Sequence, residues 1–248
     1  MSIASTDLKN YQSASNPEDD VSTTGGAVSL TGIIDDMVLA AADALKVRSS
    51  AAGDAAGTTC TITGRDATGA IVSENHALNG VSPVTFTTTF ERILKVVLTG
   101  TTTVGIVTVY RADNATVVVA LPIAKTSCRR LFYDSASAVG ALTRYEKIFW
   151  KNEHGTLALL SATVTLTADP SAKIKIGQET SVNGSATIAN RLAVPSGPTF
   201  VDDSIAQSVP GGSLAAGAVI GVWIEQDLLS NDIAYKSTFT TQLAGNSV

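Results

Sequence analysis

Few side chains in this 248-residue sequence have the types and spacing that catalysis requires. An active site needs nucleophiles, bases or metal ligands that converge on one place. The chain has two histidines, His76 and His154, and neither lies at metal-ligand spacing from the other or from a cysteine. We expect His76 to form a surface pair with Glu74, two positions earlier in a strand-like run. His154 lies in a polar turn, where we expect it to hydrogen-bond rather than act as a base.

The remaining polar residues predict no chemistry either. Serine and threonine are abundant, but the sequence contains no G-x-S-x-G elbow, P-loop or dinucleotide-binding fingerprint. Three acidic pairs could contribute to a calcium site, yet no third ligand follows any of them at loop spacing, which favours turn or helix-cap roles. These pairs are Asp19-Asp20, Asp35-Asp36 and Asp202-Asp203. We therefore predict no catalytic residue, no metal site and no cofactor, and hence a protein that is not an enzyme.

Two cysteines, Cys60 and Cys128, are too few for a disulfide framework and do not form a metal-binding pattern. The sequence favours two reduced, buried thiols in a protein made in the cytosol. A disulfide is the alternative, because the two residues lie near the ends of a segment that we interpret below as an inserted domain.

Charge and hydropathy exclude two classes of partner. The formal net charge is −5 and the isoelectric point is about 5.0, which disfavours binding to the polyanionic backbone of nucleic acid. No apolar run approaches the roughly 20 residues that a membrane helix needs. The first residues lack a basic segment followed by an apolar one, so we expect neither a secretory signal nor a membrane partner.

The composition favours an all-β fold, because threonine and valine suit pleated, half-buried surfaces. The most informative stretch runs from residue 145 to residue 166, where two β-rich segments flank a polar turn at 151–156. This pattern predicts a hairpin. Further strands are expected at Ile174–Ile176, Ala218–Glu225 and Ser237–Leu243, and we expect them to complete the same sheet.

Residues 31–128 show a different pattern, which we interpret as a second domain inserted into the first. Apolar residues at helical spacing predict one short helix at about 33–47, with Thr31 as its N-cap. Beyond it, six short strands at regular spacing predict a compact antiparallel β-sandwich. They are expected at 59–64, 70–78, 84–90, 94–98, 104–111 and 115–121.

Residues 1–30 are polar and rich in turn residues, so they cannot bury enough apolar surface to fold alone. We interpret them as an extended N-terminal arm that either lies along its own domain or reaches a neighbour. The predicted fold is thus all-β, with two β-sandwich domains. The arm (1–30) completes the outer sandwich (129–248), and the inserted sandwich occupies 31–128.

A resemblance to a known family adds a function. The segments at 3–11, 25–28, 131–134, 151–157 and 217–225 resemble a family of small virion structural proteins of tailed bacteriophages, covering roughly residues 1–30 and 129–248. Separately, residues 61–84 are similar to Ig-like β-sandwich repeats of phage head and tail proteins. The shorter family members lack most of the block between the Gly25-Gly26 segment and the Leu131-Phe132-Tyr133-Asp134 segment.

This resemblance implies a capsid decoration or cement protein on the exterior of the virion. Its partners would be the major capsid protein and further copies of itself, in a cyclic homo-oligomer such as a trimer. Aromatic residues dominate many interfaces, so the expected interface residues are Tyr11, Phe132, Tyr133 and Trp150, although Trp150 also fits a core position. Two alternatives remain open: a tail, neck or baseplate component, and an adhesin that binds a host receptor or glycan.

Overall fold

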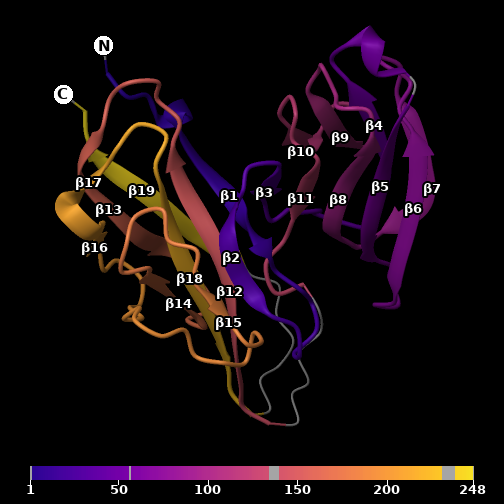
Figure 1. Cartoon of the computed structure of the whole chain (residues 1–248). Coiled ribbons are helices and arrows are strands. Elements are labelled where there is room, and N and C mark those ends of the chain that lie inside the picture. The colour runs from indigo at the N-terminus through magenta and orange to yellow at the C-terminus, as the bar shows by residue number, and fades with distance from the viewer. Residues whose placement is uncertain (1, 56, 134–139, 231–237, 248) are drawn as a thin grey trace. The chain divides into compact units, whose positions relative to one another are not determined.

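The computed structural model describes residues 2–55, 57–133, 140–230 and 238–247 and shows an all-β protein, as the composition predicts (Figure 1). Within these residues the helical elements are three short 3-10 turns: η1 (Ser5–Asp7), η2 (Ala52–Ala55) and η3 (Pro210–Gly212). The chain divides into two compact units. The first unit contains residues 1–29 and 134–248, and the second unit is the continuous segment 30–133.

The first unit contains a six-stranded antiparallel sheet with the strand order β14-β18-β12-β1-β2-β15. A second sheet forms around β13 (Leu159–Ala168), which pairs with β16, β17 and β19. The bounds of the other strands are β1 (Leu8–Ser15), β2 (Thr24–Ser29), β12 (Leu142–Asn152), β14 (Ile174–Gln178), β15 (Thr187–Ile188), β16 (Gln207–Ser208), β17 (Ser213–Leu214), β18 (Val219–Leu228) and β19 (Thr240–Asn246). Of the predicted strand Ser237–Leu243, Ser237 lies outside the described residues.

The hairpin predicted at 145–166 is wrong. Its two strands exist as β12 and β13, but β12 pairs with β1 and β18 while β13 pairs with strands of the other sheet. Asn152 fixes the loop between β12 and β13, because its buried amide donates to the carbonyls of Leu157 and Leu214. The local sequence signals a turn, but long-range pairing decides which sheet each strand joins.

The N-terminal segment lies along its own unit, where it supplies β1 and β2. Strand β1 pairs with β12 from Leu8 opposite Asn152 to Gln12 opposite Ile148. The second residue of β2 is Gly25, which has a φ of +103°. A Cβ atom there would lie 2.7 Å from the Trp223 ring, so the close approach of backbone and indole requires glycine.

The short helix predicted at 33–47 is also wrong. Residues 32–34 form β3 (Gly32–Ile34) and residues 43–49 form β4 (Asp43–Ser49), with Met37 at a φ of +43° between them. In β4 the alternate residues Leu45 and Val47 are buried. Pairing of β4 with neighbouring strands on both sides satisfies its backbone and overrides the helical spacing of apolar residues.

The second unit consists of a four-stranded sheet, β10-β9-β4-β7, and a five-stranded sheet, β3-β11-β8-β5-β6. All six strands predicted for this segment are present. Their bounds are β5 (Thr58–Arg65), β6 (Ile71–Ala77), β7 (Val84–Phe90), β8 (Arg92–Gly100), β9 (Val107–Arg111) and β10 (Val117–Leu121), and the additional β11 spans Ser127–Arg129. Buried residues from both sheets, including Ile62, Phe86 and Val109, form one hydrophobic core. This arrangement is that of a β-sandwich.

Candidate functional site

Two of the four predicted interface aromatics, Tyr11 and Trp150, belong to the first unit. Tyr11 is only 1% exposed, and its hydroxyl donates a hydrogen bond to the Glu153 carboxylate. The Tyr11 side chain therefore packs within its own unit, and its role at an interface stays a prediction. Trp150 is half-buried, and its indole nitrogen Nε1 lies 3.3 Å from Thr241 Oγ1, to which it donates.

The other two aromatics, Phe132 and Tyr133, lie in the second unit and are half-buried. Phe132 adopts a φ of +50°. The guanidinium carbon of Arg129 lies 5.1 Å from the centroid of the Tyr133 ring, a cation–π contact. The neighbouring Asp134 lies outside the described residues. The four predicted residues therefore do not form one cluster within either unit.

Both histidines have the expected roles. His76 Nε2 lies 2.6 Å from Glu74 Oε1, which confirms the predicted pair. His154 Nδ1 accepts hydrogen bonds from the backbone N–H groups of Thr156 (3.1 Å) and Leu157 (2.9 Å), so it is a turn residue in this structure.

The acidic pairs mostly organise turns. Asp19 accepts hydrogen bonds from the backbone of Val21 and Ser22, and Asp35 accepts one from Met37. Among the described residues, no group of three or more His, Cys, Asp or Glu side chains could hold a metal ion. Both cysteines are free and buried.

The most unusual polar feature of the first unit is a buried ion pair that the sequence does not identify. The Lys147 ammonium nitrogen Nζ lies 2.5 Å from Glu179 Oε1, and the two side chains are 0% and 5% exposed. Lys147 also donates to the carbonyls of Gly26 (2.9 Å) and Ala186 (3.2 Å). Burial lowers the pKa of Lys147, and the hydrogen bond and charge of Glu179 oppose that shift.

Aromatic rings and glycines surround this pair. Lys147 Nζ lies 4.6 Å from the centroid of Phe149 and 5.5 Å from that of Trp223. A Cβ atom at Gly221 would lie 2.3 Å from Glu179 Oε2 and 2.8 Å from Lys147 Cε. Because Gly221 has no side chain, there is space for the ion pair at this position. Glu179 Oε2 itself is buried with no hydrogen-bond partner in the structure.

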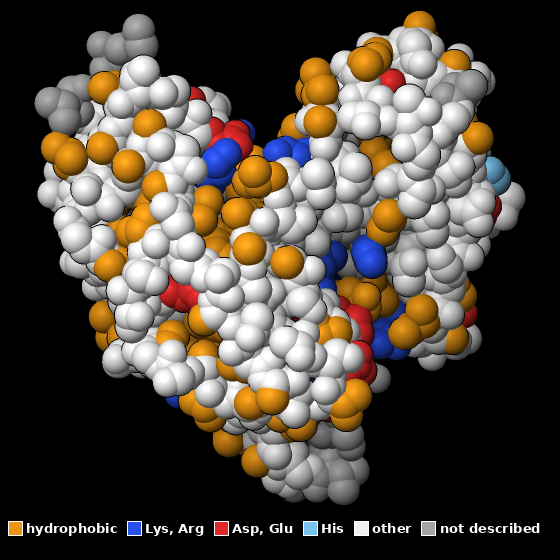
Figure 2. Space-filling view, viewed as in Figure 1, with side chains coloured by type: hydrophobic (Ala, Val, Ile, Leu, Met, Phe, Trp, Pro, Cys, Tyr) orange, Lys and Arg blue, Asp and Glu red, His pale blue; other side chains and the backbone are white. Residues whose placement is uncertain are grey.

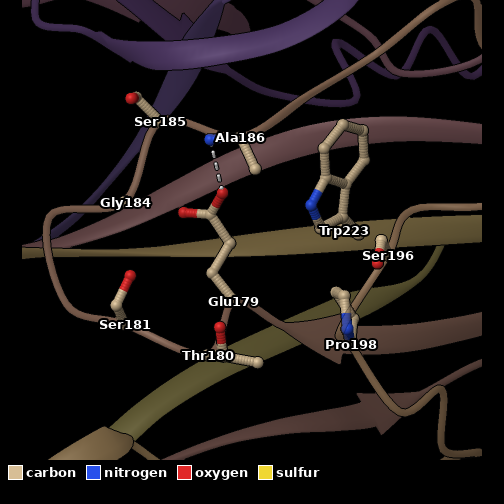
Figure 3. A pocket seen from close by; sticks show the side chains of 9 residues that line it. All are labelled: Glu179, Thr180, Ser181, Gly184, Ser185, Ala186, Ser196, Pro198 and Trp223. Carbon is tan, nitrogen blue, oxygen red and sulfur yellow. Dashed lines mark hydrogen bonds between the residues drawn. The ribbon is translucent and has the colours of Figure 1, made fainter.

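A small pocket of about 90 Å³ lies beside the pair. In Figure 3, Glu179 and Trp223 lie on different sides of this space, and a dashed line joins the Glu179 carboxylate to the Ala186 nitrogen. The pocket is lined by Glu179, Thr180, Ser181, Gly184, Ser185, Ala186, Ser196, Pro198 and Trp223. It is well below the roughly 300–1,000 Å³ of sites for drug-sized ligands, and it has room for a few water molecules.

A second charged network involves Arg191, which is 0% exposed. Its Nε lies 2.5 Å from Asp20 Oδ1, and its Nη1 lies 3.7 Å from both Glu18 Oε2 and Glu146 Oε1. Arg144 Nη2 lies 3.1 Å from Asp20 Oδ2. Burial opposes ionisation of Asp20, but hydrogen bonds from the two arginines outweigh it and lower the Asp20 pKa. The network connects the loop after β1 to β12.

Sequence reasoning missed both charged groups, although one signal was present. Arg144, Glu146 and Lys147 lie among the apolar residues of β12, and all three are buried. Charged residues in a central strand must find partners, but those partners come from distant loops. The arrangement binds segments to one another, and no nucleophile with an adjacent base appears in it.

Comparisons of the chain with protein-family models, with curated proteins and with solved structures found no match. No helix among the described residues is long and apolar enough to cross a membrane. The described fold and site therefore define this chain as an all-β protein with two compact units and buried charge networks.

Proposed function

We propose that this protein is a non-enzymatic structural protein of a tailed-phage virion, which binds the outer surface of the head as a decoration protein. The proposal rests on the resemblance expected from the sequence between residues 1–30 and 129–248 and small phage virion proteins, and one structural observation supports it. Strand β1 from the first segment pairs with β12 from the second. The two resembling segments thus form one folded unit, which is what a shared family fold requires.

The contact with the head cannot rely on a free N-terminal arm, because β1 is an interior strand of the six-stranded sheet. A better candidate is one end of the second unit, where apolar side chains are exposed on loops. Val81, Val104 and Ile106 are 52%, 64% and 44% exposed. Exposed apolar residues held in a fixed geometry are typical of protein-binding surfaces.

Buried Asp54 holds this loop end in place. Its carboxylate accepts hydrogen bonds from the backbone N–H groups of Val104 (2.9 Å) and Gly105 (3.0 Å) and from the Ser49 hydroxyl. Ser49 in turn donates its backbone N–H to the Gly80 carbonyl, next to Val81. We propose that this loop end contacts the major capsid protein, because it presents apolar residues without an ordering cost on binding.

The test is co-sedimentation of the intact protein with expanded, DNA-free phage heads. The proposal expects saturable binding at a fixed ratio to the major capsid protein. Replacing Val104 and Ile106 by Glu should weaken binding about tenfold or more, because two charges would enter an apolar contact. The matched control is Val194→Glu, at a position 69% exposed in the first unit, which should bind normally.

Two other results would redirect the assignment. Binding to purified tails but not to heads would make the protein a tail component, and binding to host cells or glycans alone would make it an adhesin. Light scattering of the free protein tests the proposed cyclic homo-oligomer. A monomer at all concentrations would contradict that part of the proposal.

A further inference from the structure

The Lys147–Glu179 pair brings an amine and a carboxyl group together in the interior of the first unit. The charged side chains visible in Figure 2 lie at the molecular surface, where solvent surrounds them, whereas Lys147 and Glu179 are 0% and 5% exposed. Burial of two ions costs free energy that their mutual attraction offsets only in part. A reaction that neutralises both groups removes this cost, which makes the pair a candidate for a covalent modification.

The two groups are close enough for a bond to form between them. Lys147 Nζ lies 2.5 Å from Glu179 Oε1, and the length of one further carbon–oxygen bond places it at most about 3.7 Å from the carboxyl carbon Cδ. Gly221 permits this approach, because a Cβ atom there would lie 2.7 Å from Glu179 Cδ and 2.8 Å from Lys147 Cε. Groups held at about 3–3.5 Å in the right orientation react at effective concentrations of roughly 10⁵–10⁸ M.

The hydrogen bonds of Lys147 also orient its nitrogen towards Glu179. An ammonium group has three N–H donors, and here the acceptors are Glu179 Oε1 (2.5 Å) and the carbonyls of Gly26 (2.9 Å) and Ala186 (3.2 Å). When the first proton passes to Oε1, the two carbonyls still hold the other two protons, so the lone pair left on Nζ is directed at Glu179. Burial lowers the pKa of Lys147 despite the opposing charge of Glu179, which favours this transfer.

The two carboxyl oxygens of Glu179 have different surroundings. Oε1 accepts hydrogen bonds from Lys147 and from the backbone N–H of Ala186 (3.0 Å), while Oε2 is buried with no hydrogen-bond partner among the described residues. A buried, charged oxygen without a donor is destabilising, and the neutral carbonyl oxygen of an amide is less so. The pocket of about 90 Å³ that Glu179 lines (Figure 3) has room for a water molecule released beside it.

We propose that Lys147 and Glu179 condense to form an isopeptide bond, which cross-links β12 to the segment that follows β14. The ion pair is the starting state. After one proton has passed from Nζ to Oε1, the Nζ lone pair attacks Cδ, the Nζ–Cδ bond forms and the Cδ–Oε1 bond breaks. Oε1 leaves as water with the transferred proton and a second proton from Nζ. Oε2 remains as the amide carbonyl oxygen, and no other reactant is consumed. This proposal does not depend on the virion assignment.

The test is the mass of the intact wild-type chain after one week at pH 7, below its unfolding temperature. The proposal expects the mass to fall by that of one water molecule. Because cyclisation of an aspartate also releases water, a tryptic digest locates the bond: residues 145–151 should be joined to residues 176–191, with no cleavage after Lys147. Lys175 and Glu225 provide an internal control, since this pair is 3.3 Å apart with side chains 40% and 11% exposed, and it should stay unlinked.

Lys147→Arg is the matched variant, because a guanidinium keeps the positive charge but stays protonated and is not a nucleophile at pH 7. It should keep its full mass. As a second measurement, condensed chains should unfold at a higher urea concentration than uncondensed ones, because a cross-link restricts the unfolded chain. Wild-type chains that keep their full mass, water loss located at other residues, or an equal loss in the Lys147→Arg variant would each overturn the proposal.

Discussion

Lys147 and Glu179 are 32 positions apart in the sequence, yet Lys147 Nζ lies 2.5 Å from Glu179 Oε1 in the interior of the first unit. The contact joins the central strand β12 to the loop that follows β14. A buried charge without a partner strongly destabilises the folded state, so each of these two residues requires the other beside it.

Removing one partner should therefore lower the free energy of unfolding of the first unit far more than removing both. Lys147→Met leaves the Glu179 carboxylate buried and unpaired, and should lower the free energy of unfolding of the first unit by about 3–5 kcal/mol. The double variant Lys147→Met/Glu179→Leu should recover much of that loss. Urea unfolding followed by tryptophan fluorescence measures this unit alone, because Trp150 and Trp223 both belong to it. Equal or additive losses in the double variant would contradict the argument.

Gly221→Ala should also destabilise the first unit. The added methyl would lie 2.3 Å from Glu179 Oε2 and 2.8 Å from Lys147 Cε, and overpacking of this kind costs about 1–3 kcal/mol. Gly155→Ala serves as the control, because a Cβ atom there meets nothing within 4 Å. The same fluorescence experiment gives both values, and equal urea midpoints for the two variants would show that the interior tolerates the methyl.

The Asp20 network should make the first unit acid-sensitive. The Asp20 pKa in the folded state lies below its ordinary value of 3.8, so its stabilising contribution is complete above pH 3.8 and is lost as the pH falls through the folded value. Asp20→Asn lacks this contribution at every pH. The urea midpoints of wild type and variant should thus differ at pH 6 and converge toward pH 2. A constant difference would exclude Asp20 ionisation as the cause.

Glu74 should protect the edge of β7 in the second unit. Its carboxylate accepts hydrogen bonds from the backbone N–H groups of Thr87 (2.9 Å) and Thr88 (2.7 Å). Although burial opposes ionisation, these bonds and the one from His76 lower the Glu74 pKa from 4.5 to about 2. Stability from Glu74 is therefore present above pH 4.5 and lost as the pH falls toward 2.

Glu74→Ala should accordingly speed amide hydrogen exchange at Thr87 and Thr88 about tenfold or more at neutral pH, since charge-assisted hydrogen bonds are among the stronger ones. Asn75→Ala, at an exposed position of the same strand, is the control and should leave both amides unchanged. Unchanged exchange in Glu74→Ala would mean that other groups protect the β7 edge.

Cys60 and Cys128 should be unreactive until the second unit unfolds. Burial raises the pKa of Cys60 to about 12, and burial together with nearby Asp35 and Asp36 raises that of Cys128 well above its ordinary value. The thiolate is the reactive form. Labelling of the native protein by a thiol reagent should therefore be slow at pH 7 and remain slow at pH 9. Both thiols should react in denaturant. A single reactive thiol, or none, in denatured protein would indicate a disulfide or oxidation.

Local sequence patterns predicted much of the second unit correctly. Alternating residues bounded by turn residues such as Asn79-Gly80 and Asp113-Asn114 identified all six expected strands, because turn chemistry and side-chain alternation are properties of a few consecutive residues. The pairing of His76 with Glu74, two positions apart on one side of a strand, was predictable for the same reason. The prediction of a helix at 33–47 was wrong because the spacing of apolar residues carries no information about β7 and β9, the strands that pair with β4.

By itself, the sequence determined the all-β class, the turns and the strands of the second unit, all of which depend on short-range preferences. Only the tertiary structure decided that β12 and β13 join different sheets, that Tyr11 is buried, and that Lys147 meets Glu179. It alone also placed Arg92 of β8 opposite Arg65 of β5. These relationships join residues tens of positions apart, and they arise from sheet register and from the need of buried charges to find partners, which no local pattern encodes.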